Sequence, residues 1–257
     1  MSKEKWLFIG SDQRLSECNR LMTTRGYESR SVKTNAYTKE LKATLIDFKP
    51  QNIVLPILEM DGSIPLELLG IGSSFYTGVV SEEWLRPYKQ GGIKVESYLQ
   101  EELFIWENAR ITAEAFILAY YAELGCTIAG KRFHVAGYGR VGKMVADVLA
   151  SLGGVVTVMA RSVAQLGEAK LRGFKVDQLS DSVKLENSCL VNTIPKKWFS
   201  AQKDTPLFIF DLASAPGCLR DASTLEYYRL LPGLPGKYFP VDAAISLADA
   251  LERIHQR

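Results

Sequence analysis

The chain has 257 residues, of which 47% are hydrophobic and 23% are charged, and its formal net charge is +2. These values are ordinary for a soluble globular protein, and the near-neutral charge argues against a nucleic-acid-binding surface. The first residues lack the long apolar region of a signal peptide, and no apolar stretch is long enough to span a bilayer. We therefore expect a cytoplasmic protein that binds neither nucleic acids nor membranes.

The cysteines are scattered and form no C-x-x-C pair: Cys18, Cys126, Cys189 and Cys218. This pattern is typical of free thiols in a reducing compartment, not of a disulfide frame or a zinc site. We expect no bound metal ion.

Strand and helix patterns alternate along the first hundred residues. Short apolar runs occur at residues 6–9, 52–57, 75–80 and 93–99, and turn residues or helical patterns separate them. Such alternation predicts a parallel sheet that helices cover on both faces. We expect residues 1–106 to form a small α/β domain that binds the substrate.

A long helix is predicted at residues 107–124, with Gly125 as its C-cap. A second series of strands follows, at residues 132–136, 155–159, 175–179, 189–194, 207–212 and 228–231. We expect residues 107–125 to link the first domain to a nucleotide-binding domain at 126–240, and the helix within 241–257 to pack back on the first domain. The predicted fold class is α/β, with two Rossmann-like parallel-sheet domains and a cleft between them.

The stretch VAGYGRVG at residues 135–142 contains the pattern G-x-G-x-x-G between a predicted strand and an amphipathic helix. In this pattern the glycines permit a tight turn, backbone approach to a pyrophosphate, and close packing of helix on strand. The helix N-terminus offers free N–H groups to the phosphates. The alternative is a glycine-rich turn that binds no nucleotide. The predicted cofactor loop comprises Gly137, Tyr138, Gly139, Arg140, Val141 and Gly142.

The end of the next strand predicts which dinucleotide is bound. NAD-binding versions carry an acidic residue there, which accepts hydrogen bonds from the ribose hydroxyls. Here the strand ends with Ala160, Arg161 and Ser162. A guanidinium group at position 161 can pair with a 2′-phosphate or stack on adenine, and Ser162 can add a hydrogen bond. The sequence therefore predicts NADP, unless Arg161 is simply a surface arginine.

The ends of two later strands carry the residues that we expect at the nicotinamide end of the cofactor. A strand that ends in NTIP (192–195) places Thr193 and Pro195 beside the nicotinamide ribose, and DLASAPG (211–217) brings Ala213 and Ser214 toward the ring and the substrate. The alternatives are a turn hydroxyl for Thr193 and a strand-end cap for Ser214.

The substrate half offers fewer candidates. Arg14, just beyond the first strand, is the candidate for binding an acidic substrate, with Asp12 to orient it. Glu114 lies in an apolar helical stretch, where burial favours the neutral carboxyl group and suits a general acid or base. The alternatives for Glu114 are a place on the exposed face of the helix or a structural role as the partner of an arginine. His134 and His255 are not placed for the histidine acid/base chemistry of the 2-hydroxy-acid dehydrogenases.

These segments, together with GSDQR (10–14), TAEA (112–115) and LPGLPG (231–236), resemble the A subunit of dipicolinate synthase. The resemblance covers nearly the whole chain and is strongest from Gly137 onward. It implies NADP(H) binding, a flavoprotein-like second (B) subunit, and oxidation of 4-hydroxy-tetrahydrodipicolinate, or its dehydrated form, to dipicolinate during sporulation. The departures at positions 10–14, 57–62 and 111–115 leave the exact small dicarboxylate substrate open, and a homo-oligomer is compatible with the sequence.

Two alternatives stay open. One is an NADP oxidoreductase similar to shikimate dehydrogenase. The other is a non-catalytic nucleotide-sensing subunit, which the absence of a clear acid/base pair favours.

Overall fold

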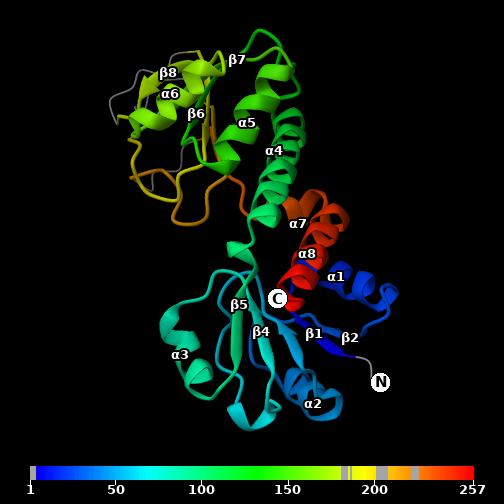
Figure 1. Cartoon of the computed structure of the whole chain (residues 1–257). Helices are drawn as coiled ribbons and strands as arrows, with labels where there is room; N and C mark the ends of the chain where they lie inside the picture. Colours follow the sequence, from blue (N-terminus) through cyan, green and yellow to red (C-terminus); the bar gives the residue numbers. More distant parts are fainter. Residues whose placement is uncertain (1–3, 181–184, 186, 201–207, 221–225) are drawn as a thin grey trace. The chain divides into compact units, whose positions relative to one another are not determined.

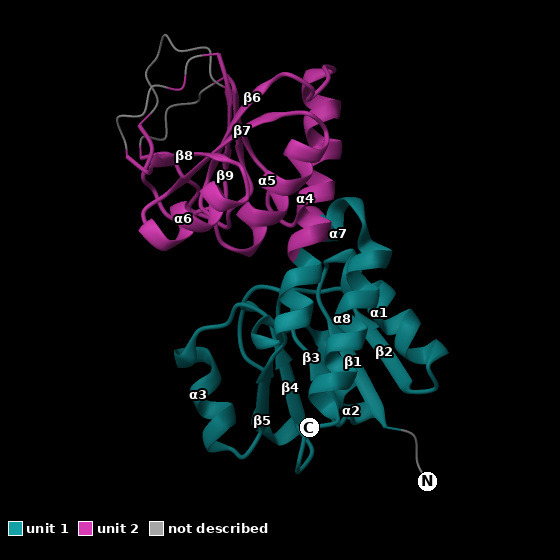
Figure 2. Ribbon diagram, turned by 45° about the horizontal axis from the view of Figure 1, so that its top comes forward, with its two compact units in different colours: residues 1–108, 235–257 teal, residues 109–234 magenta. Residues whose placement is uncertain are grey.

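The computed structural model describes residues 4–180, 185, 187–200, 208–220 and 226–257, and the chain forms two compact units (Figures 1 and 2). Unit 1 comprises Met1–Asn108 and Pro235–Arg257, and unit 2 comprises Ala109–Leu234. Every strand pairing described in either unit is parallel. The predicted fold class of two Rossmann-like α/β domains is therefore confirmed. The cleft expected between them stays a prediction.

The sheet of unit 1 has the strand order β2-β1-β3-β4-β5, which is the order of flavodoxin-like folds. Its strands are β1 (Lys5–Ile9), β2 (Glu28–Val32), β3 (Asn52–Val54), β4 (Ser74–Thr77) and β5 (Lys94–Ser97). The helical segments are α1 (Gln13–Thr24), α2 (Lys39–Phe48), η1 (Leu66–Leu68), α3 (Glu82–Gln90) and η2 (Tyr98–Gln100). The polar strand β2 was not predicted, because its side chains alternate between exposed and half-buried until Val32.

The two faces of the unit 1 sheet build separate hydrophobic cores. Successive strand residues point to opposite faces, so Trp6 and Phe8 of β1 join one core while Leu7 and Ile9 join the other. Helix α2 covers the second face through Leu41, Leu45 and Phe48.

The first face is covered by α1 and by α8 (Pro240–His255), which lie side by side in Figures 1 and 2. Leu247, Leu251 and Ile254 of α8 pack in the same core as Trp6 and Phe8. The C-terminal helix is therefore part of unit 1, although it is the last element of the chain.

Helix α4 (Glu102–Leu124) begins five residues before the predicted start of the long helix. The carboxylate of Glu101 accepts a hydrogen bond from the backbone N–H of Phe104 (2.7 Å), which caps the first turn. The same carboxylate pairs with Arg253 of α8 (2.9 Å). The sequence pattern did not reveal the earlier start, because it depends on a partner about 150 residues away.

The sheet of unit 2 has the strand order β11-β10-β9-β6-β7-β8. Numbered from β6 as the first strand, this is the Rossmann order 3-2-1-4-5-6 read from the other end. The strands are β6 (Arg132–Ala136), β7 (Val155–Ala160), β8 (Lys175–Gln178), β9 (Cys189–Asn192), β10 (Phe208–Asp211) and β11 (Tyr228–Leu230). Position 207, where the fifth of these strands was expected to begin, lies outside the described residues.

Helices α5 (Arg140–Ser151) and α6 (Val163–Leu171) connect the first strands of unit 2, and α7 (Leu234–Tyr238) leads the chain back into unit 1. The part of α4 in unit 2 packs on the sheet through aromatic rings. Phe116 lies 5.5 Å from Phe210, and Tyr120 lies 5.4 Å from Phe133, between ring centroids. Within the described residues, no helix has the length and apolarity that a membrane span requires.

Candidate functional site

The carboxyl-terminal edge of the unit 2 sheet carries most of the predicted cofactor residues. Strand β6 has β7 on one side and β9 on the other, so the strand order reverses beside it. Ligands of open parallel sheets bind at this kind of reversal, outside the carboxyl ends of the strands. The segments that follow β6, β7, β9 and β10 hold residues 137–142, 161–162, 193–195 and 213–214, and the first of them runs into the start of α5.

The three glycines that follow β6 differ in how much space surrounds the position that a side chain would occupy. Gly137 has φ +93°, and a Cβ atom there would lie 2.5 Å from Thr193 Oγ1. A Cβ atom on Gly142 would collide with the carbonyl oxygen of Gly137. A Cβ atom on Gly139 would meet nothing within 4 Å. The outer glycines are therefore needed by the loop itself, whereas Gly139 borders open space at the start of α5.

Helix α5 begins directly after Gly139, which is its N-cap residue. Because glycine has no side chain, nothing from the N-cap covers the space toward which the first helical N–H groups point. Arg140 is exposed and Val141 is half-buried. Tyr138, by contrast, is only 1% exposed, and its ring packs against Phe174. Tyr138 can therefore reach a cofactor only through its backbone.

Arg161 and Ser162 follow β7 directly, and both are exposed. The backbone carbonyl of Arg161 accepts a hydrogen bond from Gln178 Nε2 of β8 (3.1 Å), which fixes the strand end. Ser162 is the N-cap of α6 and accepts a hydrogen bond from the N–H of Gln165. The guanidinium of Arg161 is thus available at the strand end, while the Ser162 hydroxyl already serves a helix.

Thr193 and Pro195 follow β9. The Thr193 hydroxyl donates a hydrogen bond to the carbonyl oxygen of Ala136 (2.9 Å) and so ties the end of β9 to the end of β6. It also fills the space that side chains at positions 137 and 142 would need. This role is structural, although the bond reaches another strand and not the local turn that the alternative for Thr193 named. Pro195 is exposed.

Ala213 is buried and Ser214 is exposed on the loop after β10. The two strands that precede these loops end in buried polar residues that the sequence analysis did not select, Asn192 and Asp211. Both are 0% exposed, and Asn192 Nδ2 donates to Asp211 Oδ1 at 2.7 Å. The sequence could have pointed to both residues, because each is the polar last residue of an otherwise apolar strand, CLVN and FIFD.

Arg14 and Asp12 lie at the carboxyl-terminal end of β1 in unit 1. Arg14 is 7% exposed, and its Nε and Nη2 atoms donate to the two oxygens of Asp12 at 3.0 and 2.8 Å. Arg14 Nη1 lies 3.4 Å from Asn108 Oδ1. Burial alone would raise the pKa of Asp12, but the hydrogen bonds and charge of Arg14 outweigh it and leave that pKa below its usual value. The charged carboxylate of Asp12 therefore orients the guanidinium of Arg14.

The predicted burial of Glu114 is wrong. Its side chain is 49% exposed, and its Oε1 atom pairs with Arg110 Nη1 at 2.7 Å, one helical turn away. The neighbouring apolar residues of α4 face the core, whereas position 114 lies on the outer face of the helix. An exposed, paired carboxylate is the alternative that the sequence left open, so the acid/base role of Glu114 has no support from burial.

The two histidines lie outside these loops. His134 is half-buried in β6, with Nδ1 at 3.2 Å from Ser188 Oγ, and burial lowers its pKa. His255 pairs with Glu4 and contacts Tyr76 in unit 1. Over the described ranges, no group of three or more histidine, cysteine or acidic side chains could hold a metal ion.

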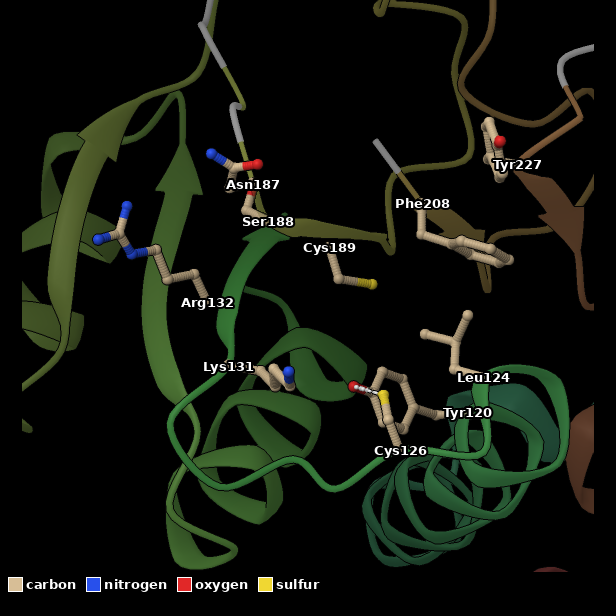
Figure 3. Close-up of a pocket in the computed structure, with 10 residues that line it drawn as sticks. All are labelled: Tyr120, Leu124, Cys126, Lys131, Arg132, Asn187, Ser188, Cys189, Phe208 and Tyr227. Atoms are coloured by element: carbon tan, nitrogen blue, oxygen red, sulfur yellow. Dashed lines mark hydrogen bonds between the residues drawn. The ribbon is translucent and has the colours of Figure 1, made fainter. Parts of the chain in front are cut away.

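Figure 3 shows a pocket of about 320 Å³ at the opposite edge of the unit 2 sheet. It opens at the amino-terminal edge, because Arg132, Cys189 and Phe208 begin β6, β9 and β10. The predicted cofactor residues do not line it. The lining residues are Tyr120, Leu124, Cys126, Lys131, Arg132, Asn187, Ser188, Cys189, Phe208 and Tyr227.

Comparison with known proteins confirms the resemblance found in the sequence. No family model matches the chain. The A subunit of dipicolinate synthase from Bacillus subtilis (strain 168) is 33% identical to it over 174 residues, which are 62% of this chain and 57% of that protein. The match thus spans rather more than half the length of that relative.

The fold likeness extends further than the sequence match. The crystal structure of the dipicolinate synthase A chain from Bacillus subtilis has a TM-score of 0.77 with 24% identity, over 100% of this chain and 97% of that one. The apo-structure of D-lactate dehydrogenase from Escherichia coli has a TM-score of 0.56 with 14% identity, over 98% and 96% of the two chains. The fold is therefore shared with a dipicolinate synthase chain and with a dehydrogenase.

Proposed function

We propose that this chain is an NADP-dependent oxidoreductase that acts as the A subunit of a dipicolinate synthase. In the proposed reaction the dehydrated form of 4-hydroxy-tetrahydrodipicolinate, which is dihydrodipicolinate, loses a hydride to NADP⁺ and a proton to water or a protein base. The products are dipicolinate and NADPH. The sequence similarity to the dipicolinate synthase relative supports the substrate class, and the dehydrogenase-type fold supports the reaction type.

The observation that carries the proposal is the geometry of the glycine loop. Two glycines are needed to fold the loop, and the third borders open space at the N-terminus of a twelve-residue helix. A pyrophosphate can approach the backbone there and accept hydrogen bonds from free N–H groups. A glycine-rich turn with no ligand would not require the open side of Gly139.

The preference for NADP rests on the strand end at Arg161. Its exposed guanidinium lies where NAD-binding relatives of this fold carry an acid. Gln178 holds the backbone of this strand end in place. A cation at this position attracts a 2′-phosphate, but it cannot accept the hydrogen bond that a free 2′-hydroxyl donates to an acidic residue.

When bound, NADP would supply a nicotinamide ring that accepts the hydride. The residues proposed for its ring and ribose end are Thr193, Pro195, Ala213 and Ser214, from the loops after β9 and β10. Thr193 is held by its hydrogen bond to Ala136, so its hydroxyl can act toward a ligand only as an acceptor. Ser214 is exposed and keeps its hydroxyl for the cofactor or the substrate.

Arg14 is proposed to bind a carboxylate of the substrate. A guanidinium has five N–H groups, and Asp12 and Asn108 engage three of those of Arg14. One N–H remains on Nη1 and one on Nη2, which is the pair that binds a carboxylate bidentately. The pairing with Asp12 fixes the guanidinium plane in advance, so the substrate does not have to order it.

A second candidate function is a nucleotide-sensing subunit that performs no chemistry itself. The exposure of Glu114 and its pairing with Arg110 favour it, because they leave no identified acid or base among the residues that the structure describes. In that case another polypeptide would complete the reaction. The resemblance to a protein named as one subunit of an enzyme supports such a partner, which we propose to be a flavoprotein-like B subunit of dipicolinate synthase. A cytoplasmic location stays an expectation.

The deciding experiment follows the near-ultraviolet absorbance of NADPH after the purified chain is mixed with NADP⁺ and freshly made product of dihydrodipicolinate synthase. An increase in this absorbance, together with dipicolinate formation by the chain alone, would establish an oxidoreductase. Turnover that needs the added B subunit would establish a shared enzyme.

Matched arms separate the alternatives. NAD⁺ in place of NADP⁺ tests the cofactor, and shikimate as the substrate tests the shikimate-dehydrogenase-like alternative. NADP⁺ binding without turnover of any substrate, with or without the B subunit, would support the nucleotide-sensing function and reject the enzyme.

A further inference from the structure

The loops after β9 and β10 are joined by a buried carboxylate that has no free acceptor position. Asp211 Oδ1 accepts from Asn192 Nδ2 (2.7 Å) and from the N–H of Ala213 (3.2 Å). Asp211 Oδ2 accepts from the N–H of Cys218 (2.6 Å) and from the Tyr228 hydroxyl (2.8 Å). An ionised carboxylate offers about four lone-pair positions, so these donors use all of them.

Asn192 is equally occupied. Its Oδ1 atom accepts from Trp198 Nε1 (2.9 Å) and from the N–H of Ile194 (3.2 Å). Its Nδ2 atom donates to Asp211 and to the carbonyl oxygen of Ile194 (3.0 Å). Both side chains are 0% exposed. Neither residue can therefore touch a cofactor, although both stand at the carboxyl ends of strands.

The hydrogen bonds fall on the backbone that flanks the proposed nicotinamide residues. Asn192 fixes Ile194, which lies between Thr193 and Pro195, and Asp211 fixes Ala213, which precedes Ser214. The two side chains bond to each other, so the two loops hold a single relative position. In a buried environment of this kind, a donor left without its acceptor destabilises the structure, which makes other loop positions unfavourable.

The glycine of the segment DLASAPG follows from the same network. Gly217 has φ +76°, and a Cβ atom there would lie 2.5 Å from the Tyr228 hydroxyl and 3.0 Å from Asp211 Oδ2. Position 217 must therefore stay bare for Tyr228 to reach Asp211.

We propose that Asp211, together with Asn192, is a positioning residue that sets the nicotinamide end of the cofactor site without contacting the cofactor. The proposal rests on the proposed function, since it assumes that NADP binds at this edge of the sheet. It predicts that the binding of the nicotinamide end can be disturbed without disturbing the binding of the adenosine end. Loss of the Asp211 carboxylate should disturb the loops after β9 and β10 and leave the glycine loop and Arg161 in place.

The test compares two probes on one variant, Asp211→Asn. The amide keeps the shape of the side chain but presents a donor to groups that are themselves donors. NADP⁺ spans the whole site, whereas adenosine 2′,5′-bisphosphate occupies only its adenosine end. We expect Asp211→Asn to weaken NADP⁺ binding about tenfold to a hundredfold in calorimetric titration, and to change bisphosphate binding less than about threefold.

Two further variants exclude a general loss of structure. Asp147→Asn makes the same chemical change at a half-buried surface carboxylate of the same unit, which pairs with Arg172, and should leave both affinities unchanged. The double variant Asn192→Asp with Asp211→Asn restores the hydrogen bond between the two side chains, but leaves the Ile194 carbonyl oxygen and the Ala213 N–H without their side-chain partners. It should recover at least about threefold of the lost NADP⁺ affinity.

The outcomes are distinct. Wild-type NADP⁺ affinity in Asp211→Asn, or an equal loss of both probes, would overturn the positioning role. If Asp211→Asn does not fold, Tyr228→Phe removes one of the four hydrogen bonds more gently and must show the same selective loss of NADP⁺ affinity. Wild-type protein that binds neither probe would overturn the proposed function itself, and the inference with it.

Discussion

Gly236 lies against Asp12, so closely that a Cβ atom at position 236 would come within 2.5 Å of Asp12 Oδ1. The same atom would lie 2.9 Å from Arg14 Nε. The second glycine of LPGLPG thus packs on the ion pair of GSDQR, and these two segments of the resemblance meet within unit 1. Gly236 belongs to α7, and because it has no side chain it leaves room for the arginine and its orienting carboxylate.

Gly236→Ala should displace the Asp12–Arg14 pair. We expect a loss of about 1–3 kcal/mol in the free energy of unfolding, because the added methyl group meets a partly buried ion pair whose two hydrogen bonds hold it in place. In the activity assay it should raise KM for the substrate without changing NADP affinity, because it displaces the proposed carboxylate partner Arg14 and no cofactor contact. Gly70→Ala is the matched control, since its nearest contact at 3.6 Å is ordinary. Unchanged stability and KM in Gly236→Ala would contradict this account of Gly236.

Arg161→Asp should change the choice of cofactor. It replaces a phosphate partner by an acceptor for ribose hydroxyls, so NADP binding should weaken by about tenfold to a hundredfold while NAD binding stays equal or improves. Titration of both dinucleotides into both proteins provides the measurement. Wild-type protein that binds NAD more tightly than NADP would show that Arg161 is only a surface arginine.

Gly139→Val should abolish dinucleotide binding while the protein stays folded. The open space beside Gly139 accommodates the new side chain, but that space is the approach path of the pyrophosphate. Gly142→Ala is the informative contrast, because its methyl group would collide with the loop backbone and lower the melting temperature as well. Unchanged cofactor affinity in a folded Gly139→Val protein would refute the site.

Glu114→Gln tests the remaining acid/base candidate. Because the carboxylate is exposed and paired with Arg110, we expect kcat to stay within about threefold of wild type. A general acid or base at this position would instead cost on the order of 10²–10⁴ in kcat with binding nearly intact. A fall of that size would restore Glu114 to the catalytic machinery.

Glu101→Gln should make unit 1 less stable at neutral pH but not at acid pH. The hydrogen bonds from Arg253 lower the pKa of Glu101 below its ordinary value of 4.5, against the opposing effect of burial, and the N–H of Phe104 adds to the lowering. A carboxyl group with a lowered pKa stabilises the fold above its ordinary pKa and loses that contribution as the pH falls through the lowered value. We expect a deficit of about 1–3 kcal/mol at pH 7 that shrinks below pH 4.5.

Urea unfolding of both proteins across this pH range measures the deficit. Glu82→Gln, at an exposed pair with Lys89, is the control and should have little effect at any pH. A deficit that is the same at neutral and acid pH would show that the charge of Glu101 contributes nothing.

The sequence by itself determined the two α/β domains and the glycine loop. Both depend on local patterns: apolar runs that end at turn residues, and a glycine spacing that only a strand–turn–helix unit uses. The sequence alone assigns different structural roles to Gly137, Gly139 and Gly142, because each role depends on the backbone within a few residues. Their environments agree with that assignment.

Burial and distant partners could be decided only by the tertiary structure. Glu114 looked buried because its neighbours are apolar, but the rotation of α4 against its core turns position 114 outward. The start of α4 depends on Arg253, and the space around Gly236 depends on Asp12, each more than 150 residues away in the chain. The hydrogen bond between Asn192 and Asp211 can form only when β9 and β10 pair in register. Local preference fixes which elements form, whereas a hydrogen bond between distant residues exists only after the sheet has brought its strand ends together.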